Sequence, residues 1–389
     1  MKKILFISHD ASRTGAPFVL LYLMKWLKKN CNYQIDILLL QDGPLRDDFA
    51  AVASNIYVND NFLYKNKYVY HILKESKLLL SDRKRMLRVG RNINITKYDI
   101  VYGNTIISLP WLTTFKEKSD AVFIAAIHEL ESVIQAFRPV EYVSENLSKL
   151  DLVLAGSSAV ATLLRRKYDI SEALIKVAHA YIPNLLLFDE PINETENLRI
   201  NSINTFVIGM VGNAQWRKGT DLLVPLGVYL TKKYPEFDFN LVWIGVDSES
   251  HFVKNIQLDI ERANLTNKVI LLNSTEHYLN YIKQFDVFAL LSREDPFPLV
   301  CLEAGLLSKP IIMFDGAGGT IELLQNGAGI IVPYLDIVAL GDELYNLSED
   351  TKMRKVISDR LREEVVSNYT VDVACKKVNE LFSELLLKK

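Results

Sequence analysis

The chain of 389 residues is long enough for two domains of roughly 150 to 200 residues each, and its 49% hydrophobic residues can fill two cores. A formal net charge of −2 gives no electrostatic reason to expect a nucleic-acid partner. Three distant cysteines and six scattered histidines form neither a disulfide framework nor a zinc motif, so we expect a reducing cytoplasmic setting and no bound metal.

The N-terminus begins with two lysines and a short apolar run that ends at His9 and Asp10. A signal peptide needs an apolar region of roughly 7 to 15 residues, so a first β-strand is the better interpretation. The turn Thr14-Gly15-Ala16-Pro17 follows and leads into an apolar helix, which Pro17 suits because proline is favoured in a first helical turn.

Apolar runs alternate with helical patterns along both halves of the chain. The runs are continuously apolar, as expected for strands that are covered on both faces, so we predict an α/β fold with two parallel, doubly wound sheets. The predicted strands are 3–8, 34–40, 55–58, 99–102, 121–127, 151–155, 205–211, 239–244, 268–272, 286–291, 310–314 and 329–332.

A locally basic segment runs from Lys65 to Arg91 with apolar residues interleaved. It fits either a contact with an anionic membrane surface or a lipid-diphosphate acceptor, and equally a solvated helix face. Further along, His128 follows the predicted strand 121–127 and therefore faces the ligand-binding edge of a parallel sheet. A structural histidine is the alternative.

A polar, asparagine-rich stretch separates the halves. We therefore predict a first domain at 1–184, a linker at 185–204 and a second domain at 205–370. The last helix, from residue 371 to the end, can complete the first domain or pack on the second.

The second half opens with a strand, a glycine-containing loop and a helix near Thr220. Arg217 and Lys218 stand just before that helix, where cations beside free N–H groups suit a diphosphate. A solvated basic loop is the alternative.

The segment SREDPFPLVCLEAG, residues 292–305, follows a buried strand and carries Asp295 and Glu303 eight positions apart. A helix beginning near Pro298 directs free N–H groups at the turn, which suits a phosphate, and Glu303 can accept from ligand hydroxyl groups. The pattern predicts a ligand with both phosphate and hydroxyl groups. Downstream, the loop GAGGTIE, with Gly318, Gly319 and Thr320, allows close backbone approach to a ligand or forms a plain turn.

The Arg-Lys-Gly loop followed by the paired acids resembles the retaining glycosyltransferases of family 4. The resemblance extends over the whole chain and is most specific between residues 209 and 332. It implies the GT-B architecture, in which two Rossmann-like domains face each other across a cleft and the second domain binds a nucleotide-sugar. It also implies that neither a metal nor another cofactor is needed.

The resemblance assigns roles to individual residues of the second half. Glu303 would hold the ribose hydroxyls, and Asp295, in place of a more usual glutamate, would lie near the donor sugar, with adjacent Glu294 as the alternative. Arg217 and Lys218 would hold the diphosphate, although Asn213 stands where relatives often have an arginine. The remaining donor-binding residues are the backbone N–H groups of Phe297, Leu299 and Val300 together with Gly318, Gly319 and Thr320.

In the first half, the resemblance implies that Gly15 approaches the donor phosphate and that His128 hydrogen-bonds the donor sugar. The predicted activity is therefore retaining transfer of a sugar from a UDP- or GDP-linked donor to a glycan or lipid-linked acceptor. We expect a cytoplasmic enzyme of polysaccharide or glycoconjugate synthesis, at the inner face of the membrane if the basic segment binds lipid. The alternatives are a nucleotide-sugar epimerase of the same fold and a non-catalytic nucleotide-sugar-binding protein.

Overall fold

A computed structural model describes residues 1–59, 90, 92–183, 197–198 and 202–389. The chain divides into two compact units, residues 1–179 with 371–389, and residues 180–370. The division falls near the expected linker 185–204, most of which lies outside the described residues. The basic segment from Lys65 to Arg91 also lies outside them, apart from Gly90.

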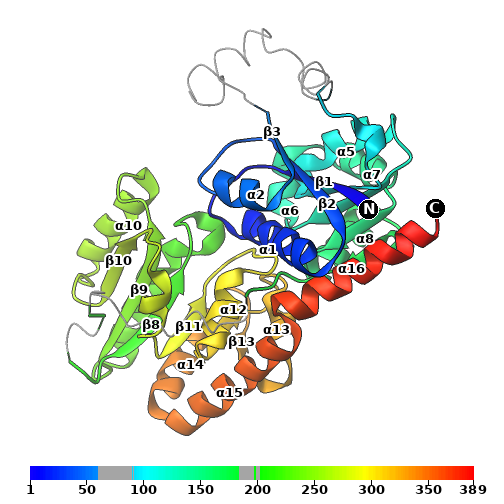
Figure 1. The fold of residues 1–389 in the computed structure, drawn as a ribbon. Helices are drawn as coiled ribbons and strands as arrows, with labels where there is room; N and C mark the ends of the chain where they lie inside the picture. The colour runs from blue at the N-terminus through cyan, green and yellow to red at the C-terminus, as the bar shows by residue number, and fades with distance from the viewer. Residues whose placement is uncertain (60–89, 91, 184–196, 199–201) are drawn as a thin grey trace, which may run out of the picture. The chain divides into compact units, whose positions relative to one another are not determined.

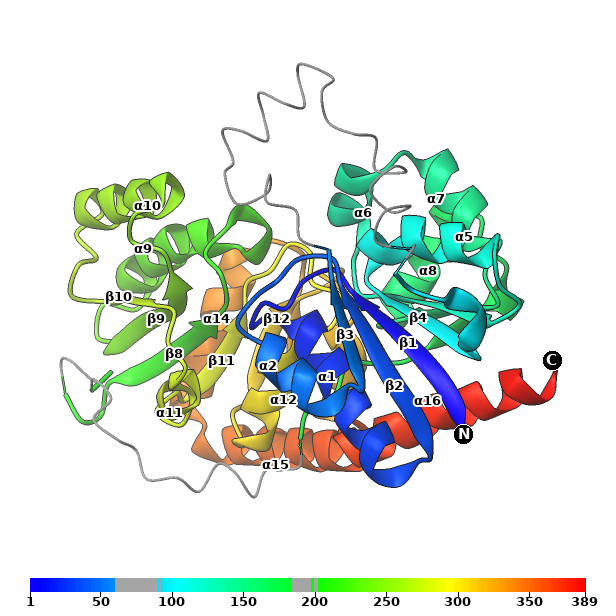
Figure 2. The same ribbon diagram turned by 45° about the horizontal axis from the view of Figure 1, so that its top comes forward.

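The first unit is built on a seven-stranded parallel sheet in the order β3-β2-β1-β4-β5-β6-β7. Figure 2 shows β1, β2 and β3 side by side, as their parallel pairing requires. The inner strands are buried along almost their whole length, which explains their continuously apolar sequences. The strands are β1 Lys2–Ser8, β2 Tyr33–Leu39, β3 Asn55–Val58, β4 Ile100–Asn104, β5 Val122–Ile127, β6 Leu152–Ala155 and β7 Ile175–Val177.

Helices join these strands and cover the sheet. The described helices of this unit are α1 Gly15–Asn30, α2 Arg46–Val52, η2 Ile95–Lys97, η3 Ile106–Ser108, α5 Leu109–Lys116, α6 Glu131–Phe137, α7 Val140–Leu147, α8 Ser158–Tyr168, η4 Glu172–Leu174 and α16 Val371–Leu387. Ser157 caps α8, since its side chain accepts from the backbone N–H of Val160.

The C-terminal helix α16 packs on the first unit, alongside α1 (Figure 1). The indole N–H of Trp26 donates to Asp372 at 2.9 Å, and the Tyr33 hydroxyl donates to Asn379 at 3.1 Å. The buried ring of Phe382 lies 6.0 Å from that of Tyr102 on β4. The last helix therefore contributes to the first hydrophobic core, although it is far from that core in sequence.

The second unit contains a six-stranded parallel sheet in the order β10-β9-β8-β11-β12-β13. Its strands are β8 Phe206–Val211, β9 Phe239–Val246, β10 Val269–Asn273, β11 Val287–Leu290, β12 Ile311–Phe314 and β13 Ile330–Val332. Its described helices are η5 Trp216–Lys218, η6 Thr220–Leu222, α9 Leu223–Lys233, α10 His251–Arg262, α11 Tyr278–Ile282, α12 Leu299–Leu306, α13 Thr320–Leu323, η7 Gln325–Gly327, α14 Ile337–Glu349 and α15 Thr351–Asn368.

Each sheet has one point at which the strand order reverses, between β1 and β4 and between β8 and β11. Ligands of open α/β sheets bind at the carboxyl ends of the strands beside such a point. The turns that follow these four strands therefore position the candidate sites. Among the described helices, none combines the length and the apolar character that crossing a bilayer requires.

Candidate functional site

The turns after β8 and β11 touch each other at the reversal point of the second sheet. Gly219, directly after η5, has a φ of 78°, and a Cβ at this position would lie only 2.0 Å from the carbonyl oxygen of Leu291. The backbone N–H of Arg293 also donates to the carbonyl of Arg217 at 2.8 Å. Glycine is required for this approach, which brings the basic loop against the acidic segment.

Lys218 and Asp295 form an ion pair across this contact. The Lys218 Nζ lies 2.5 Å from Oδ2 of Asp295, and the Ser292 hydroxyl donates to the same oxygen at 3.1 Å. The Asp295 side chain is only 6% exposed, so the pair is largely shielded from water. The structure thus joins two residues that were predicted to serve different parts of a ligand.

Arg217 and Glu294 meet at the same place. The Arg217 guanidinium donates to the backbone carbonyl of Glu294 at 2.5 Å and lies 3.9 Å from Oδ1 of Asp295. The Glu294 side chain is half-buried, whereas that of Asp295 is buried. The two acids therefore differ in their access to a ligand, a difference that their sequence positions did not reveal.

Arg293 supports the basic loop and was not predicted as a site residue. Its guanidinium forms a bidentate ion pair with Asp221, with N–O distances of 2.7 and 2.8 Å, and donates to the Trp216 carbonyl at 2.6 Å. It also lies over the Trp216 ring, 4.6 Å from the centroid. These contacts fix the loop that carries Arg217 and Lys218. The only sequence signal was the arginine next to the acidic pair.

The glycine loop after β12 packs on the acidic turn. Gly318 has a φ of 145°, and a Cβ there would lie 1.8 Å from the Asp295 carbonyl oxygen. The backbone N–H of Asp295 donates to Ala317 at 2.7 Å, and that of Gly319 donates to Pro296 at 3.0 Å. The loop therefore holds the turn in place. Thr320 is buried, and its hydroxyl lies beside the thiol of Cys301.

Helix α12 begins directly after this turn. Pro298, where the helix was predicted to begin, is its N-cap, and Leu299 and Val300 form its first turn. The N–H groups of a first turn have no acceptor within the helix, so they can bind an anion. The Phe297 ring packs 5.2 Å from that of Tyr369, which fixes the chain as it enters the helix.

Glu303 is buried on α12 with one oxygen unused. The Tyr278 hydroxyl donates to its Oε1 at 2.8 Å, whereas Oε2 has no partner among the described residues. Burial raises the pKa of Glu303 to about 7, although the hydrogen bond from Tyr278 lowers it in part. A ligand hydroxyl would supply the missing partner. Tyr278, at the start of α11, was not predicted because it follows a different strand.

In the first unit, Asn104 at the end of β4 joins two predicted site elements. Its side-chain NH₂ donates to the carbonyl of Ala16, next to Gly15 at the start of α1, at 3.0 Å. Its side-chain oxygen lies 3.0 Å from Nε2 of His128, which follows β5. The structure therefore places the Gly15 turn and His128 around one buried amide.

Glu129 fixes the backbone beside His128. Its carboxylate accepts from the N–H of His128 at 2.9 Å and from the N–H of Ile106, which lies 3.3 Å from both oxygens. Burial raises the pKa of Glu129 to about 7 against the effect of these hydrogen bonds. Burial, and then the nearby His9, lower the pKa of His128 to about 4, so its ring is neutral at pH 7.

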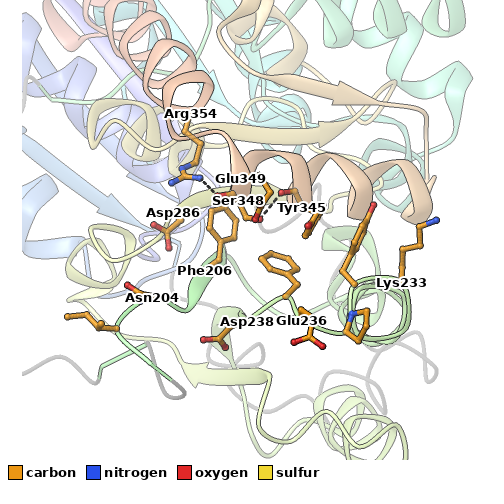
Figure 3. A pocket seen from close by; sticks show the side chains of 14 residues that line it. Asn204, Phe206, Lys233, Glu236, Asp238, Asp286, Tyr345, Ser348, Glu349 and Arg354 are labelled. Atoms are coloured by element: carbon orange, nitrogen blue, oxygen red, sulfur yellow. Dashed lines mark hydrogen bonds between the residues drawn. The ribbon is translucent and has the colours of Figure 1, made fainter.

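A cavity of about 770 Å³ lies at the opposite, amino-terminal edge of the second sheet (Figure 3). Its polar side chains already support the starts of the strands. Asp238 accepts from the hydroxyls of Ser202 and Thr205, Asp286 accepts from a β8 backbone N–H, and Arg354 donates to the carbonyl of Ser348. The carboxyl edge, with its unused Glu303 oxygen, is therefore the better candidate site.

Comparison with known proteins gives a family match for the second unit. Residues 193–364 match the family model described as glycosyl transferases group 1. An uncharacterized glycosyltransferase of Haemophilus influenzae is 28% identical over 229 residues, which cover 54% of this chain and 60% of that relative. The UDP-Gal:alpha-D-GlcNAc-diphosphoundecaprenol alpha-1,3-galactosyltransferase of Escherichia coli is 22% identical over 376 residues, 93% of this chain and 92% of that enzyme.

Solved structures resemble the whole chain. HepE from Anabaena, solved in complex with UDP, has a TM-score of 0.76 and 20% identity, and the match covers 99% of this chain and 100% of HepE. Sucrose-phosphate synthase from Thermosynechococcus elongatus has a TM-score of 0.77 and 17% identity, with both chains fully covered. At these identities the likeness establishes the fold, and the expected GT-B fold is confirmed.

Proposed function

Because the family match and the relatives support a group 1 glycosyltransferase, we propose that the chain is a retaining enzyme of family 4 that transfers a sugar from a nucleotide-sugar to a glycan or lipid-linked acceptor. The observation that carries the proposal is the buried Glu303 with its unused oxygen, next to a helix N-terminus and two cations at the carboxyl edge of the sheet. This combination supports a ligand with vicinal hydroxyl groups and a diphosphate.

In this proposal Glu303 accepts hydrogen bonds from the ribose. Its Oε1 is held by Tyr278, which orients the carboxylate and leaves Oε2 for a hydroxyl donor. A charged oxygen is a stronger acceptor than a neutral one, and binding would compensate for its burial. Tyr278 is therefore a supporting residue of the ribose site.

The diphosphate would be bound by Arg217 and Lys218 together with the N–H groups of Phe297, Leu299 and Val300. These positive groups would stabilise the charge that develops on the departing nucleoside diphosphate, so the proposal needs no metal or other cofactor. Gly318, Gly319 and Thr320 would flank the sugar.

Asp295 and Glu294 would share the sugar side of the site. The ion pair favours Asp295 as the residue that orients Lys218, because its carboxylate is buried and already neutralised. That leaves half-buried Glu294 as the acid with access to the sugar. In the first unit, His128 would bind the donor sugar, and Gly15 would approach its phosphate.

The names of relatives favour UDP over GDP as the nucleotide and a lipid-linked acceptor over a free glycan. HepE was solved with UDP and with UDP-glucose, and the Escherichia coli relative acts on a diphosphoundecaprenol-linked sugar. We therefore propose a cytoplasmic enzyme of polysaccharide synthesis that works at the inner face of the membrane, with the segment from Lys65 to Arg91 as a candidate lipid contact.

The proposal is tested by incubating the chain with UDP- and GDP-sugars, with and without a polyprenyl-diphosphate-linked acceptor. We expect a glycosylated lipid that depends on both substrates, with the anomeric configuration of the donor retained. An isomerised donor formed without acceptor would identify an epimerase. Tight nucleotide binding with neither product, across a panel of sugars and acceptors, would identify a binding protein.

A further inference from the structure

The Asn104 amide has only one orientation that satisfies both of its neighbours. The carbonyl of Ala16 can only accept, so the NH₂ group of Asn104 must face it, at 3.0 Å. The Asn104 oxygen then faces Nε2 of His128, also at 3.0 Å. Since an amide oxygen can only accept, Nε2 must carry a proton. Asn104 is fully buried, so water does not compete for these bonds.

With its proton on Nε2, the neutral His128 ring has a lone pair on Nδ1. Burial keeps the ring neutral at pH 7, and the nearby His9 lowers the pKa of His128 further. The hydrogen bond with Asn104 uses Nε2 and leaves Nδ1 as the second polar atom of the ring. The side chain therefore offers a hydrogen-bond acceptor, which is suited to a hydroxyl or N–H donor and not to an anion.

Gly156, after β6, lies beside Nδ1 of His128 and has no side chain to crowd it. A Cβ at this position would lie 3.2 Å from Nδ1 of His128 and 3.3 Å from the Ile127 carbonyl oxygen, which is closer than most Cβ contacts. Its backbone needs no special φ, so glycine is not required here for conformation. The missing side chain instead keeps space next to Nδ1.

The turn that presents Asn104 is strained and firmly held. Thr105 has a φ of 76° and a ψ of 159°, a region that is otherwise used almost only by glycine. Its backbone N–H donates to Ala126 at 2.8 Å, and its carbonyl accepts from the Ser108 hydroxyl at 2.7 Å. Glu129 ties the next residue, Ile106, to the backbone of His128. Such strain persists where the surrounding structure fixes it, typically at functional sites.

We propose that Asn104 is a positioning residue that fixes the Nε2–H tautomer of His128, so that Nδ1 accepts a hydrogen bond from a hydroxyl group of the substrate. The same Asn104 amide also bonds to the Gly15–Ala16 turn, so the turn and the His128 ring are held by one side chain. That the hydroxyl belongs to a sugar rests on the proposed function, whereas the tautomer does not.

The tautomer is tested by ¹⁵N NMR of histidine-labelled full-length protein at pH 7, with His128 assigned from the spectrum of His128→Gln. We expect one neutral form with the proton on Nε2. Asn104→Asp keeps the accepting oxygen and should keep this form, whereas Asn104→Leu should give a mixture or the Nδ1–H form. A proton on Nδ1 in the wild type, or an unchanged tautomer in Asn104→Leu, would overturn the proposal.

Transfer kinetics test the role of Nδ1. Gly156→Ala crowds Nδ1 without touching Asn104, so it should lower kcat/KM roughly tenfold, the effect of losing about one hydrogen bond, while the NMR tautomer stays the same. Asn104→Leu should lower kcat/KM similarly, and Asn104→Asp should recover part of it. Unchanged kcat/KM in Gly156→Ala would overturn the role of Nδ1. If the tautomer is as expected but no sugar is transferred, the proposed function fails and the tautomer assignment stands.

Discussion

Glu303→Gln tests how much folding stability the chain loses because the Glu303 carboxylate on α12 is buried. Burial raises the pKa of Glu303 from 4.5 to about 7 in the folded chain. At about 1.36 kcal/mol per pKa unit, this shift corresponds to roughly 3 kcal/mol of lost stability once the group is ionised. Glutamine keeps the shape and one accepting oxygen but carries no charge, so it should remove this cost.

The sign of the effect follows from proton binding. Below pH 4.5 the Glu303 carboxyl is protonated in both the folded and the unfolded chain, so its ionisation does not change the free energy of unfolding. Between pH 4.5 and 7 the folded chain binds more protons, so the free energy of unfolding falls as the pH rises, and the full loss remains above pH 7. The variant should therefore gain about 3 kcal/mol relative to the wild type between pH 4 and pH 8.

Equilibrium urea unfolding at several pH values from 4 to 8 measures this difference. Contributions from other groups, such as Glu129, cancel when variant and wild type are subtracted. Glu363→Gln, at an exposed position on α15, is the matched control and should show no such trend. If the stability difference for Glu303→Gln is constant across this pH range, the assignment of a buried, ionisable Glu303 is wrong. The same variant should weaken UDP binding roughly 10- to 100-fold, because a charged acceptor is lost.

Three further predictions concern the geometry of the two units. Gly318→Ala should destabilise the second unit by roughly 3 kcal/mol or more in thermal unfolding, because the added Cβ would meet the carbonyl oxygen of Asp295. Gly316→Ala, with a φ of 68° and open space around it, should destabilise the unit by only about 1 to 2 kcal/mol, and equal losses would contradict the close contact at Gly318. Lys218→Met should lower the free energy of unfolding by about 3 kcal/mol, and the double variant with Asp295→Asn should lower it much less. Additive losses in a double-mutant cycle would refute the ion pair. Ser157→Ala should lower the free energy of unfolding by about 1 kcal/mol because α8 loses its cap. An unchanged melting temperature would argue against a stabilising cap at Ser157.

The fold could largely be predicted because buried parallel strands have continuously apolar sequences. The short edge strand Asn55–Val58 was found from its run of Ile56, Tyr57 and Val58, although none of its residues is fully buried. The other predicted strands agree with the structure to within about two residues at each end. The edge strand Ile175–Val177 was missed because only Ile175 is buried, so its sequence lacks an apolar run. The last helix was predicted, but its packing partner depends on tertiary contacts that its own sequence does not show.

The candidate site was only partly predictable, because its residues come from different strands. Glu303 was found from its spacing to Asp295, but its partner Tyr278 follows β10 and carries no local signal. The pairing of Lys218 with Asp295 depends on β8 and β11 being neighbours in the sheet, which sequence spacing does not reveal. For the same reason, the sequence did not reveal Asn104 as the partner of His128.

The most direct test of the central claim is a calorimetric titration of UDP into the full-length chain and into Glu303→Gln. The account predicts one saturable UDP site in the wild type, with binding weakened at least roughly tenfold in Glu303→Gln and unchanged in Glu363→Gln. The absence of binding by both UDP and GDP, or equal affinity in all three proteins, would contradict a nucleotide-sugar site on the second unit.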